Sequence, residues 1–151
     1  MEKHFANLHT IVLAESRSQR IYLGGTCNGS RWREDRVIPV LEQLNIDYFN
    51  PIVDDWDDSA RKNELYQRNK GCDTLLYVIT PKMQGVYSIA EVVDDSNKRP
   101  ESTIFVIERV DGDTFSQSQW RSLNAVARLV EQNGVKTFYS IDEFLTSLQR
   151  S

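Results

Sequence analysis

The run Thr74-Leu75-Leu76-Tyr77-Val78-Ile79 is the feature that most limits the folds open to this chain. An unbroken stretch of apolar and β-branched residues is typical of a strand that is covered on both faces, as in the centre of a parallel sheet. Other runs of strand length alternate along the chain with longer amphipathic stretches. This alternation predicts βα units, which build a mainly parallel sheet with helices on both sides.

The predicted strands cover residues 20–24, 47–50, 74–79, 103–107 and 135–139, and the predicted helices lie between and after them. Pro39 should kink or divide the helix over residues 31–44, because it lacks a backbone N–H. Gly71 should close the helix over residues 59–70 in the left-handed conformation. We therefore predict an α/β fold, a flavodoxin-like three-layer sandwich whose five-stranded, mainly parallel sheet has the order 2-1-3-4-5.

Helix starts are also marked by polar residues. Ser116 with Gln119 forms a capping-box pattern before a helix that runs to Gly134, and Ser140 with Glu143 repeats the pattern before the last helix. A chain of 151 residues is long enough for one domain with a proper core. We assign residues 20–151 to this domain and residues 1–19 to an N-terminal extension, in which residues 10–14 fit either an extra strand or a short helix.

Composition excludes several classes of function. The net charge is −4 and the basic residues are scattered, so we expect no basic surface of the kind that binds duplex nucleic acid. A free nucleoside or nucleotide is compatible with this charge. No run approaches the roughly 20 apolar residues of a membrane span, and no signal peptide is seen, so we expect a cytoplasmic protein without a membrane partner. Cys27 and Cys72 lack the spacing of a metal site and predict reduced thiols.

Only two histidines occur, His4 and His9, and both precede the first predicted strand. An acid, base or nucleophile is therefore to be sought among Asp, Glu, Ser, Cys and Tyr. The loop after the first strand contains Gly24, Gly25, Thr26 and Asn28, whose small side chains would let a sugar or an anion approach the backbone. The alternative is that this loop only turns the chain.

The predicted strand order places the switch point between strands one and three, so the loops after them should face one cleft. Glu91 lies near the start of the helix that follows strand three, among apolar neighbours that would partly desolvate it. A carboxylate held there is suited to attack an anomeric carbon. The alternative is an ordinary glutamate on a helix surface.

The segment Asn50-Pro51-Ile52-Val53-Asp54-Asp55-Trp56-Asp57 follows strand two. An indole can stack on a base, and a carboxylate can accept hydrogen bonds from sugar hydroxyls or base N–H groups, so Asp54, Asp55 and Trp56 are candidate substrate-binding residues. Alternatively, Trp56 covers an edge of the core and residues 57–59 cap the next helix. Trp32, at the start of the helix after the glycine loop, belongs to its apolar face and is also a substrate-binding candidate.

Together with residues 21–30 and 87–91, the Asn-Pro-x-x-Asp-Asp-Trp segment resembles the nucleoside 2-deoxyribosyltransferase-like family, in particular a branch with that motif. The resemblance covers residues 20–107. It implies cleavage or transfer at the N-glycosidic bond of a nucleoside or nucleotide, with Glu91 as nucleophile or stabiliser of the oxocarbenium ion. It implies no metal or organic cofactor, and it implies a homodimer or a larger homo-oligomer, because family members commonly complete their pocket with a neighbouring subunit.

The resemblance also implies a second acid on the helix before strand three. Asp73 matches the aspartate that begins this strand, and Glu64 is then the nearest acid, with a shift of one residue; the alternative is a solvated Glu64 paired with Arg61 or Arg68. The chain departs from the family at Val92 and Val93, which follow Glu91 in place of Leu-Gly. It also has Gly85 where relatives carry the acid that binds the sugar 5′-hydroxyl, so a 5′-phosphate or another substituent is compatible, with Ser88 as its donor.

Two other functions stay open at this point. A non-catalytic nucleotide-binding or sensing module would keep the fold and lose the chemistry, and the changed residues around Glu91 favour it. A TIR-like NAD glycohydrolase would also use a glutamate on a flavodoxin-like sheet, although the Asn-Pro-x-x-Asp-Asp-Trp segment argues against it. Hydrolysis and transfer, and ribose and deoxyribose, are not distinguished by the sequence.

Overall fold

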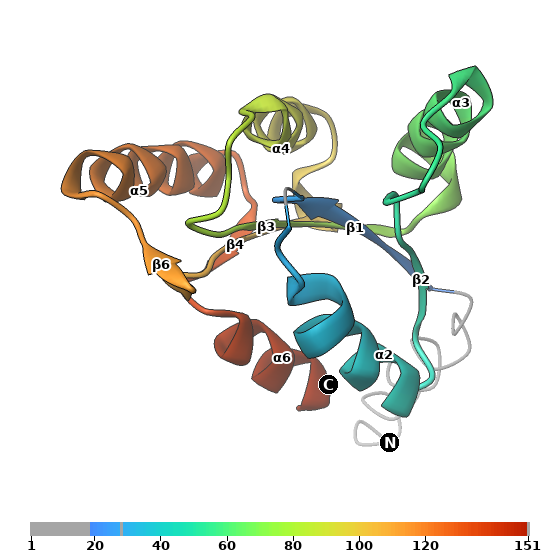
Figure 1. The fold of residues 1–151 in the computed structure, drawn as a ribbon, viewed down its shortest axis with the longest axis horizontal. Coiled ribbons are helices and arrows are strands. Elements are labelled where there is room, and N and C mark those ends of the chain that lie inside the picture. The colour runs from blue at the N-terminus through green and yellow to red at the C-terminus, as the bar shows by residue number, and fades with distance from the viewer. Residues whose placement is uncertain (1–18, 28, 151) are drawn as a thin grey trace, which may run out of the picture.

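The computed structural model describes residues 19–27 and 29–150, in which five parallel strands form the central sheet (Figure 1). The predictions for residues 10–14 and for Asn28 lie outside the described residues. Along the sheet the strands are β2 (Asp47–Phe49), β1 (Arg20–Gly25), β3 (Thr74–Ile79), β4 (Thr103–Ile107) and β7 (Lys136–Phe138). Every neighbouring pair is parallel, and the sequential order 2-1-3-4-5 is confirmed.

Helices cover both faces of the sheet (Figure 1). On one face lie α2 (Ile38–Gln43) and α6 (Ile141–Gln149), and on the other lie α3 (Asp58–Tyr66), α4 (Tyr87–Lys98) and α5 (Gln117–Gln132). A short 3-10 helix, η4 (Pro100–Ser102), precedes β4. The predicted three-layer, flavodoxin-like α/β sandwich is confirmed.

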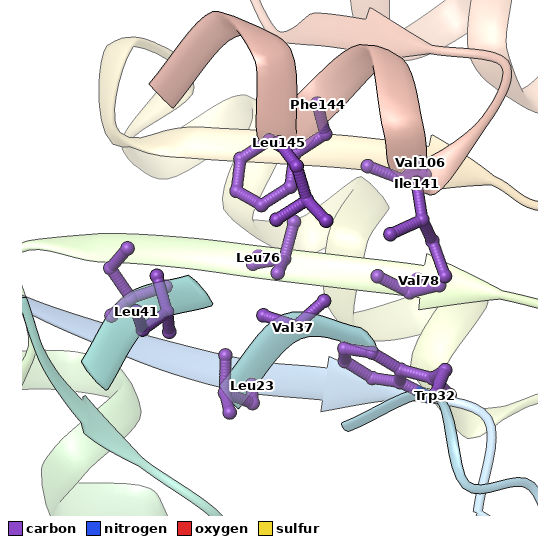
Figure 2. Packing of buried hydrophobic residues seen from close by; sticks show 11 residues of the cluster. Leu23, Trp32, Val37, Leu41, Leu76, Val78, Val106, Ile141, Phe144 and Leu145 are labelled. Atoms are coloured by element: carbon purple, nitrogen blue, oxygen red, sulfur yellow. The ribbon is translucent and has the colours of Figure 1, made fainter. Parts of the chain in front are cut away.

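The strand residues alternate between two cores because successive side chains of a strand point to opposite faces. Leu76 and Val78 of β3 belong to the core under α2 and α6, whereas Leu75, Tyr77 and Ile79 belong to the core under α4 and α5. All five are buried, which explains why this strand is apolar throughout. Figure 2 shows the first core, where Trp32, Val37 and Leu41 approach Leu23 from one side and Ile141, Phe144 and Leu145 close it from the other.

The helix after β1 runs without a break from residue 32 to residue 43, but it is irregular near Pro39. A π-helical segment, η2 (Arg33–Val37), passes directly into α2, in which Pro39 is the second residue and contributes no N–H. The prediction for Gly71 is wrong, since Gly71 is not among the glycines with positive φ. Instead α3 widens into a π-helical segment, η3 (Gln67–Gly71), and a Cβ at Gly71 would lie 2.5 Å from the side-chain oxygen of Gln67.

Two helix caps are confirmed. The Ser116 hydroxyl accepts from the N–H of Gln119 at 3.0 Å, and the Gln119 side chain accepts from the N–H of Ser116 at 2.9 Å, which is a complete capping box. Ser140 accepts from the N–H of Glu143 at 3.0 Å. Residues 110–114 form a small antiparallel hairpin of β5 (Val110–Asp111) and β6 (Asp113–Thr114). In the described part of the chain, no helix is long and apolar enough to cross a membrane.

Candidate functional site

A cleft with a volume of about 380 Å³ opens at the carboxyl ends of β1 and β3, where the chain order of the sheet reverses. Its position agrees with the general rule for ligand sites in open α/β sheets. The residues predicted for the site that line this cleft are Gly24, Gly25, Thr26, Trp56, Glu64, Gly85, Ser88 and Glu91. They come from four separate stretches of sequence, which the fold brings together.

The floor of the cleft depends on Gly25. Its φ of 121° belongs to the region that favours glycine, and a Cβ at this position would lie 2.0 Å from the carbonyl oxygen of Val78. The close approach lets the N–H of Thr26 donate to that carbonyl at 2.9 Å. The loop after β1 is therefore held tightly against the end of β3.

Glu91 lies in the second turn of α4 and is only 7% exposed. Burial raises the pKa of Glu91 to about 7, and the negative charges of Glu64 and Asp95 act in the same direction. The guanidinium of Arg68 opposes this shift, since its Nε lies 3.8 Å from Glu91 Oε2. Near neutral pH the side chain is thus divided between its acid and its carboxylate forms, the condition expected of a group that takes part in chemistry.

Glu64, on α3, faces the same cleft and accepts a hydrogen bond of 2.7 Å from the hydroxyl of Tyr22. Burial, and then the charge of Glu64, raise the pKa of Tyr22 well above its usual value, so the phenol stays protonated and remains a donor. In the described part of the chain Glu64 makes no ion pair; Arg61 pairs with Asp58, and Arg68 with the carboxylates of α4. The alternative of a Glu64–arginine pair is therefore wrong.

A buried polar network lies behind Glu91. Asp95 is fully buried and accepts from the Tyr77 hydroxyl at 2.6 Å, from Arg68 Nε at 3.2 Å and from Arg99 Nε at 2.9 Å. Arg68 also reaches Asp94 at 2.9 Å on the more exposed side of α4. One guanidinium thus serves three carboxylates, and Glu91 receives its weakest contact.

The segment after β2 forms one wall of the cleft through Pro51, Ile52, Val53 and Trp56. Trp56 is 53% exposed, so it does not cover an edge of the core. Asp57 caps α3, because its carboxylate accepts from the N–H of Ala60 at 2.8 Å, which confirms the capping alternative for this residue.

Three predicted substrate-binding residues do not line the cleft. Asp54 and Asp55 are exposed on the loop before α3. Trp32 is 3% exposed in the core, and its indole N–H donates to the carbonyl of Thr26 at 2.9 Å, so it reaches the cleft only through the backbone of the loop. Asn28 lies outside the described residues.

The sequence did not single out Tyr22, Arg33 or Arg68. Arg33 is 2% exposed, lines the cleft and donates to the carbonyls of Leu23, Gly25 and Thr26 at distances between 2.8 and 3.2 Å. The helical spacing of four residues from Asp95 to Arg99 is a local signal that could have found part of the network, because these two side chains do pair. Nothing local in the sequence marks Tyr22, which is one of several apolar-flanked strand residues.

This arrangement can attack or stabilise an electron-deficient carbon. One buried carboxyl group, a second one bonded to a phenol, and an exposed indole share a cleft of ligand size. Among residues 19–27 and 29–150, no group of three or more His, Cys, Asp or Glu side chains could hold a metal ion.

Comparison with known proteins identifies a family for this chain. No curated protein and no solved structure matches the chain significantly. A family model described as nucleoside 2-deoxyribosyltransferase like matches residues 18–110, a segment that contains β1, β3, Glu64 and Glu91. The match spans more than half of the chain, and the protein therefore belongs to the nucleoside 2-deoxyribosyltransferase-like family.

Proposed function

We propose that this protein cleaves or transfers the N-glycosidic bond of a nucleoside or nucleotide, with Glu91 as the carboxylate that acts on C1′. Membership of the family suggests chemistry at this bond. The observation that carries the proposal is the placement of Glu91 and Glu64 in one cleft, with Glu91 nearly buried and its pKa raised to about 7. We also propose that the chain belongs to the branch with the Asn-Pro-x-x-Asp-Asp-Trp motif.

In the proposed reaction the ionised Glu91 attacks C1′, and the electron pair of the C1′–N bond leaves with the base. The resulting glycosyl ester is released by water in hydrolysis, or by the nitrogen of a second base in transfer. Glu64 in its acid form gives a proton to the leaving nitrogen and becomes the carboxylate to which the Tyr22 hydroxyl donates, a bond that orients it. This two-carboxylate scheme resembles the logic of retaining glycosidases.

The remaining cleft residues hold the ligand in this proposal. The backbone at Gly24, Gly25 and Thr26 admits the sugar, Trp56 stacks on the base, and Ser88 donates to the substituent at the 5′ position. Gly85 leaves space for that substituent, since a Cβ there would meet no atom within 4 Å. Contacts from Asp54 and Asp55 stay a prediction.

The test is release of base from a panel of nucleosides and their 5′-monophosphates, followed by chromatography. We expect the wild type to release base and Glu91→Gln to lose at least about a thousandfold in rate, because the carboxamide is no nucleophile. Glu101→Gln, a change at an exposed glutamate outside the cleft, is the matched control and should keep the wild-type rate. A sugar ester on the Glu91 peptide, found by mass spectrometry after rapid quenching, would identify the nucleophile.

The same panel separates the rival functions. If ligands raise the melting temperature of the wild type while no base is released, the protein is a non-catalytic binding module. If NAD is included and nicotinamide is released while nucleosides are untouched, a TIR-like glycohydrolase activity replaces the proposal.

We further propose a homodimer. Among the residues that the structure describes, nine large hydrophobic side chains are exposed, and seven of them lie in segments that line the cleft or adjoin it: Ile52, Val53, Trp56, Leu65, Tyr66, Val86 and Tyr87. Such a concentration of exposed apolar surface is typical of an interaction site. Light scattering should give the mass of a dimer for the wild type and of a monomer for Val86→Asp. A monomeric wild type would contradict the homodimer but not the proposed reaction.

A further inference from the structure

Three loops at the cleft edge of the sheet meet at a single carboxylate oxygen. Asp111 Oδ2 accepts from the hydroxyl of Ser30 at 2.6 Å and from the hydroxyl of Thr80 at 2.7 Å. Ser30 belongs to the loop after β1, Thr80 follows β3 directly, and Asp111 lies in the hairpin after β4. One side chain therefore ties together segments that follow three adjacent strands.

The hydrogen bonds from Asp111 extend through Thr80 to the wall of the cleft. Thr80 is fully buried, and its N–H donates to the hydroxyl oxygen of Thr26 at 2.9 Å. Thr26 is 3% exposed and lines the cleft. Only Thr80 stands between Asp111 and Thr26, so a shift of the hairpin carboxylate would pass directly to the residue that faces the ligand.

The hairpin holds Asp111 in place. Asp111 pairs with Asp113 in the register of β5 and β6, and Gly112 between them has a φ of 79°, which a tight turn of this kind requires. The hairpin also lies beside the segment after β3, since a Cβ at Gly112 would be in ordinary contact, at 3.5 Å, with Cε of Lys82. In the described part of the chain Asp111 makes no ion pair, so its two hydroxyl donors are the interactions that define its position.

We propose that Asp111 is a positioning residue for the loop after β1, which holds Ser30 directly and sets Thr26 through Thr80. The loop is already held from the helix side by Trp32 and Arg33 at the carbonyl of Thr26. Asp111 adds a second anchor from the opposite side. The inference rests on the proposed function only in that the ligand held by this loop is taken to be the sugar.

Asp111 lies one residue beyond the segment that the family model matches, so this anchor comes from outside the matched region. The two catalytic candidates do not depend on it: Glu91 and Glu64 are held by α4, α3 and Tyr22. Loss of the anchor should therefore weaken ligand binding and leave the chemical step nearly unchanged.

The experiment compares Asp111→Ala, Asp111→Asn and Asp113→Ala. Asparagine keeps an oxygen that can accept both hydroxyl donors, alanine removes it, and Asp113, the exposed register partner, is the matched control. Hydrogen exchange of the amides of residues 24–30 is measured alongside KM and kcat for base release.

We expect Asp111→Ala to raise both the exchange rate of this loop and KM by about tenfold, with kcat within about threefold of the wild type, as loss of a charge-assisted hydrogen bond predicts. Asp111→Asn should restore most of both values, and Asp113→Ala should match the wild type. A purely structural role would lower the melting temperature of Asp111→Ala without this split between KM and kcat.

Unchanged loop exchange in Asp111→Ala, or equal losses in the Asn and Ala variants, would overturn the positioning role. Should Asp111→Ala fail to fold, Ser30→Ala removes one donor from the half-buried loop and is expected to raise exchange by about threefold. If the wild type releases no base, the proposed function fails, while the exchange comparison still decides whether Asp111 anchors the loop.

Discussion

The two faces of the central sheet are made by the same alternating strands, yet they bury different chemistry. The face under α2 and α6 is packed with aliphatic and aromatic side chains (Figure 2). The face under α3 and α4 holds Arg68, Asp95, Tyr77 and Glu91 beside its apolar residues. Arg33, at the start of the helix on the first face, is buried as well, but it donates to backbone carbonyls and pairs with no carboxylate. The difference teaches that the first face gains its stability mainly from apolar packing, whereas the second buries the interacting carboxylates that the candidate site needs.

The polar face tolerates its charges because they are paired. In the described part of the chain, no buried side-chain nitrogen or oxygen lacks a hydrogen-bond partner. Glu91 has the weakest interaction of the three carboxylates around Arg68, because its Oε2 lies 3.8 Å from Arg68 Nε. The polar network is thus complete everywhere except at the group that faces the cleft.

The largest effect is expected at the centre of the polar face. Asp95→Ala removes a fully buried carboxylate and leaves Arg68, Arg99 and the Tyr77 hydroxyl without their shared partner. The free energy of unfolding should fall by about 3–5 kcal/mol, as for other broken buried pairs. Urea unfolding measures this, and Asp94→Ala, whose side chain is 42% exposed, should lose less than about 1 kcal/mol. Equal losses of unfolding free energy in Asp95→Ala and Asp94→Ala would mean that the buried network contributes no more to stability than an exposed ion pair.

The apolar face should respond to a cavity rather than to a lost charge. Leu41→Ala, at a position with no exposure, should lower the free energy of unfolding by about 3 kcal/mol. Because Leu41 is outside the cleft, KM and kcat should keep their wild-type values at temperatures where the variant is folded. Leu129→Ala, on a side chain that is 46% exposed, is the control for a leucine outside the core. A changed KM in Leu41→Ala would show that the two faces are coupled.

The ionisation of Glu91 should make the stability of the protein depend on pH. The pKa of Glu91 is about 7 in the folded protein and 4.5 as its reference, so folding favours the protonated side chain. Its stabilising contribution is complete below pH 4.5 and is lost as the pH rises through 7. Glu91→Gln cannot ionise and should therefore exceed the wild type by on the order of 2 kcal/mol at pH 8, with the difference vanishing near pH 4. Denaturant unfolding at both pH values checks this; a difference that is the same at both pH values would contradict the assignment.

Tyr22 connects the polar face with the cleft. Tyr22→Phe removes the donor to Glu64 and should cost about 1 kcal/mol of stability and about tenfold in base release. Tyr48→Phe is matched to it, since the Tyr48 hydroxyl donates to Glu42 at 2.9 Å on the exposed surface. That variant should keep the wild-type activity. Equal behaviour of the two phenylalanine variants would remove Tyr22 from the site.

The smallest effect on stability is expected at the rim of the cleft. Trp56→Ala should change the free energy of unfolding by less than about 0.5 kcal/mol, because the indole is 53% exposed. If the indole stacks on the base, KM should rise by about tenfold, in line with 1–3 kcal/mol per stacked base. Val110→Ala, at another exposed apolar position, should leave KM unchanged. A stable variant with an unchanged KM would contradict the stacking role.

Local patterns were sufficient for most of the fold. The apolar run of β3, the caps at Ser116 and Ser140 and the irregular helix around Pro39 each depend on neighbours a few residues away, and the structure has all of them. The π-helical end at Gly71 and the hairpin around Gly112 were not predicted. The Gln67 oxygen that crowds Gly71 accepts from Arg20, 47 positions away, and Gly112 lies near Lys82 of the segment after β3, so both elements involve residues distant in the sequence.

Less of the candidate site could be predicted from the sequence. Glu91 and Glu64 could be named from their residue types and from the resemblance, but whether Trp32 faced a ligand or the core depended on where its helix packs. Tyr22 is bonded to a residue 42 positions away, and Arg68 to one 27 positions away, so no local pattern marks either bond.

The sequence by itself determined the alternation of strands and helices, and with it the parallel sheet and the edge at which a cleft must open. This follows because hydrophobic periodicity and backbone preferences act over a few residues. The tertiary structure alone decided which side chains are desolvated together: the exposure of Glu91, its distance from Arg68 and the meeting of Ser30, Thr80 and Asp111 at one oxygen. Burial and electrostatic interaction depend on proximity in space, which the order of residues along the chain does not record.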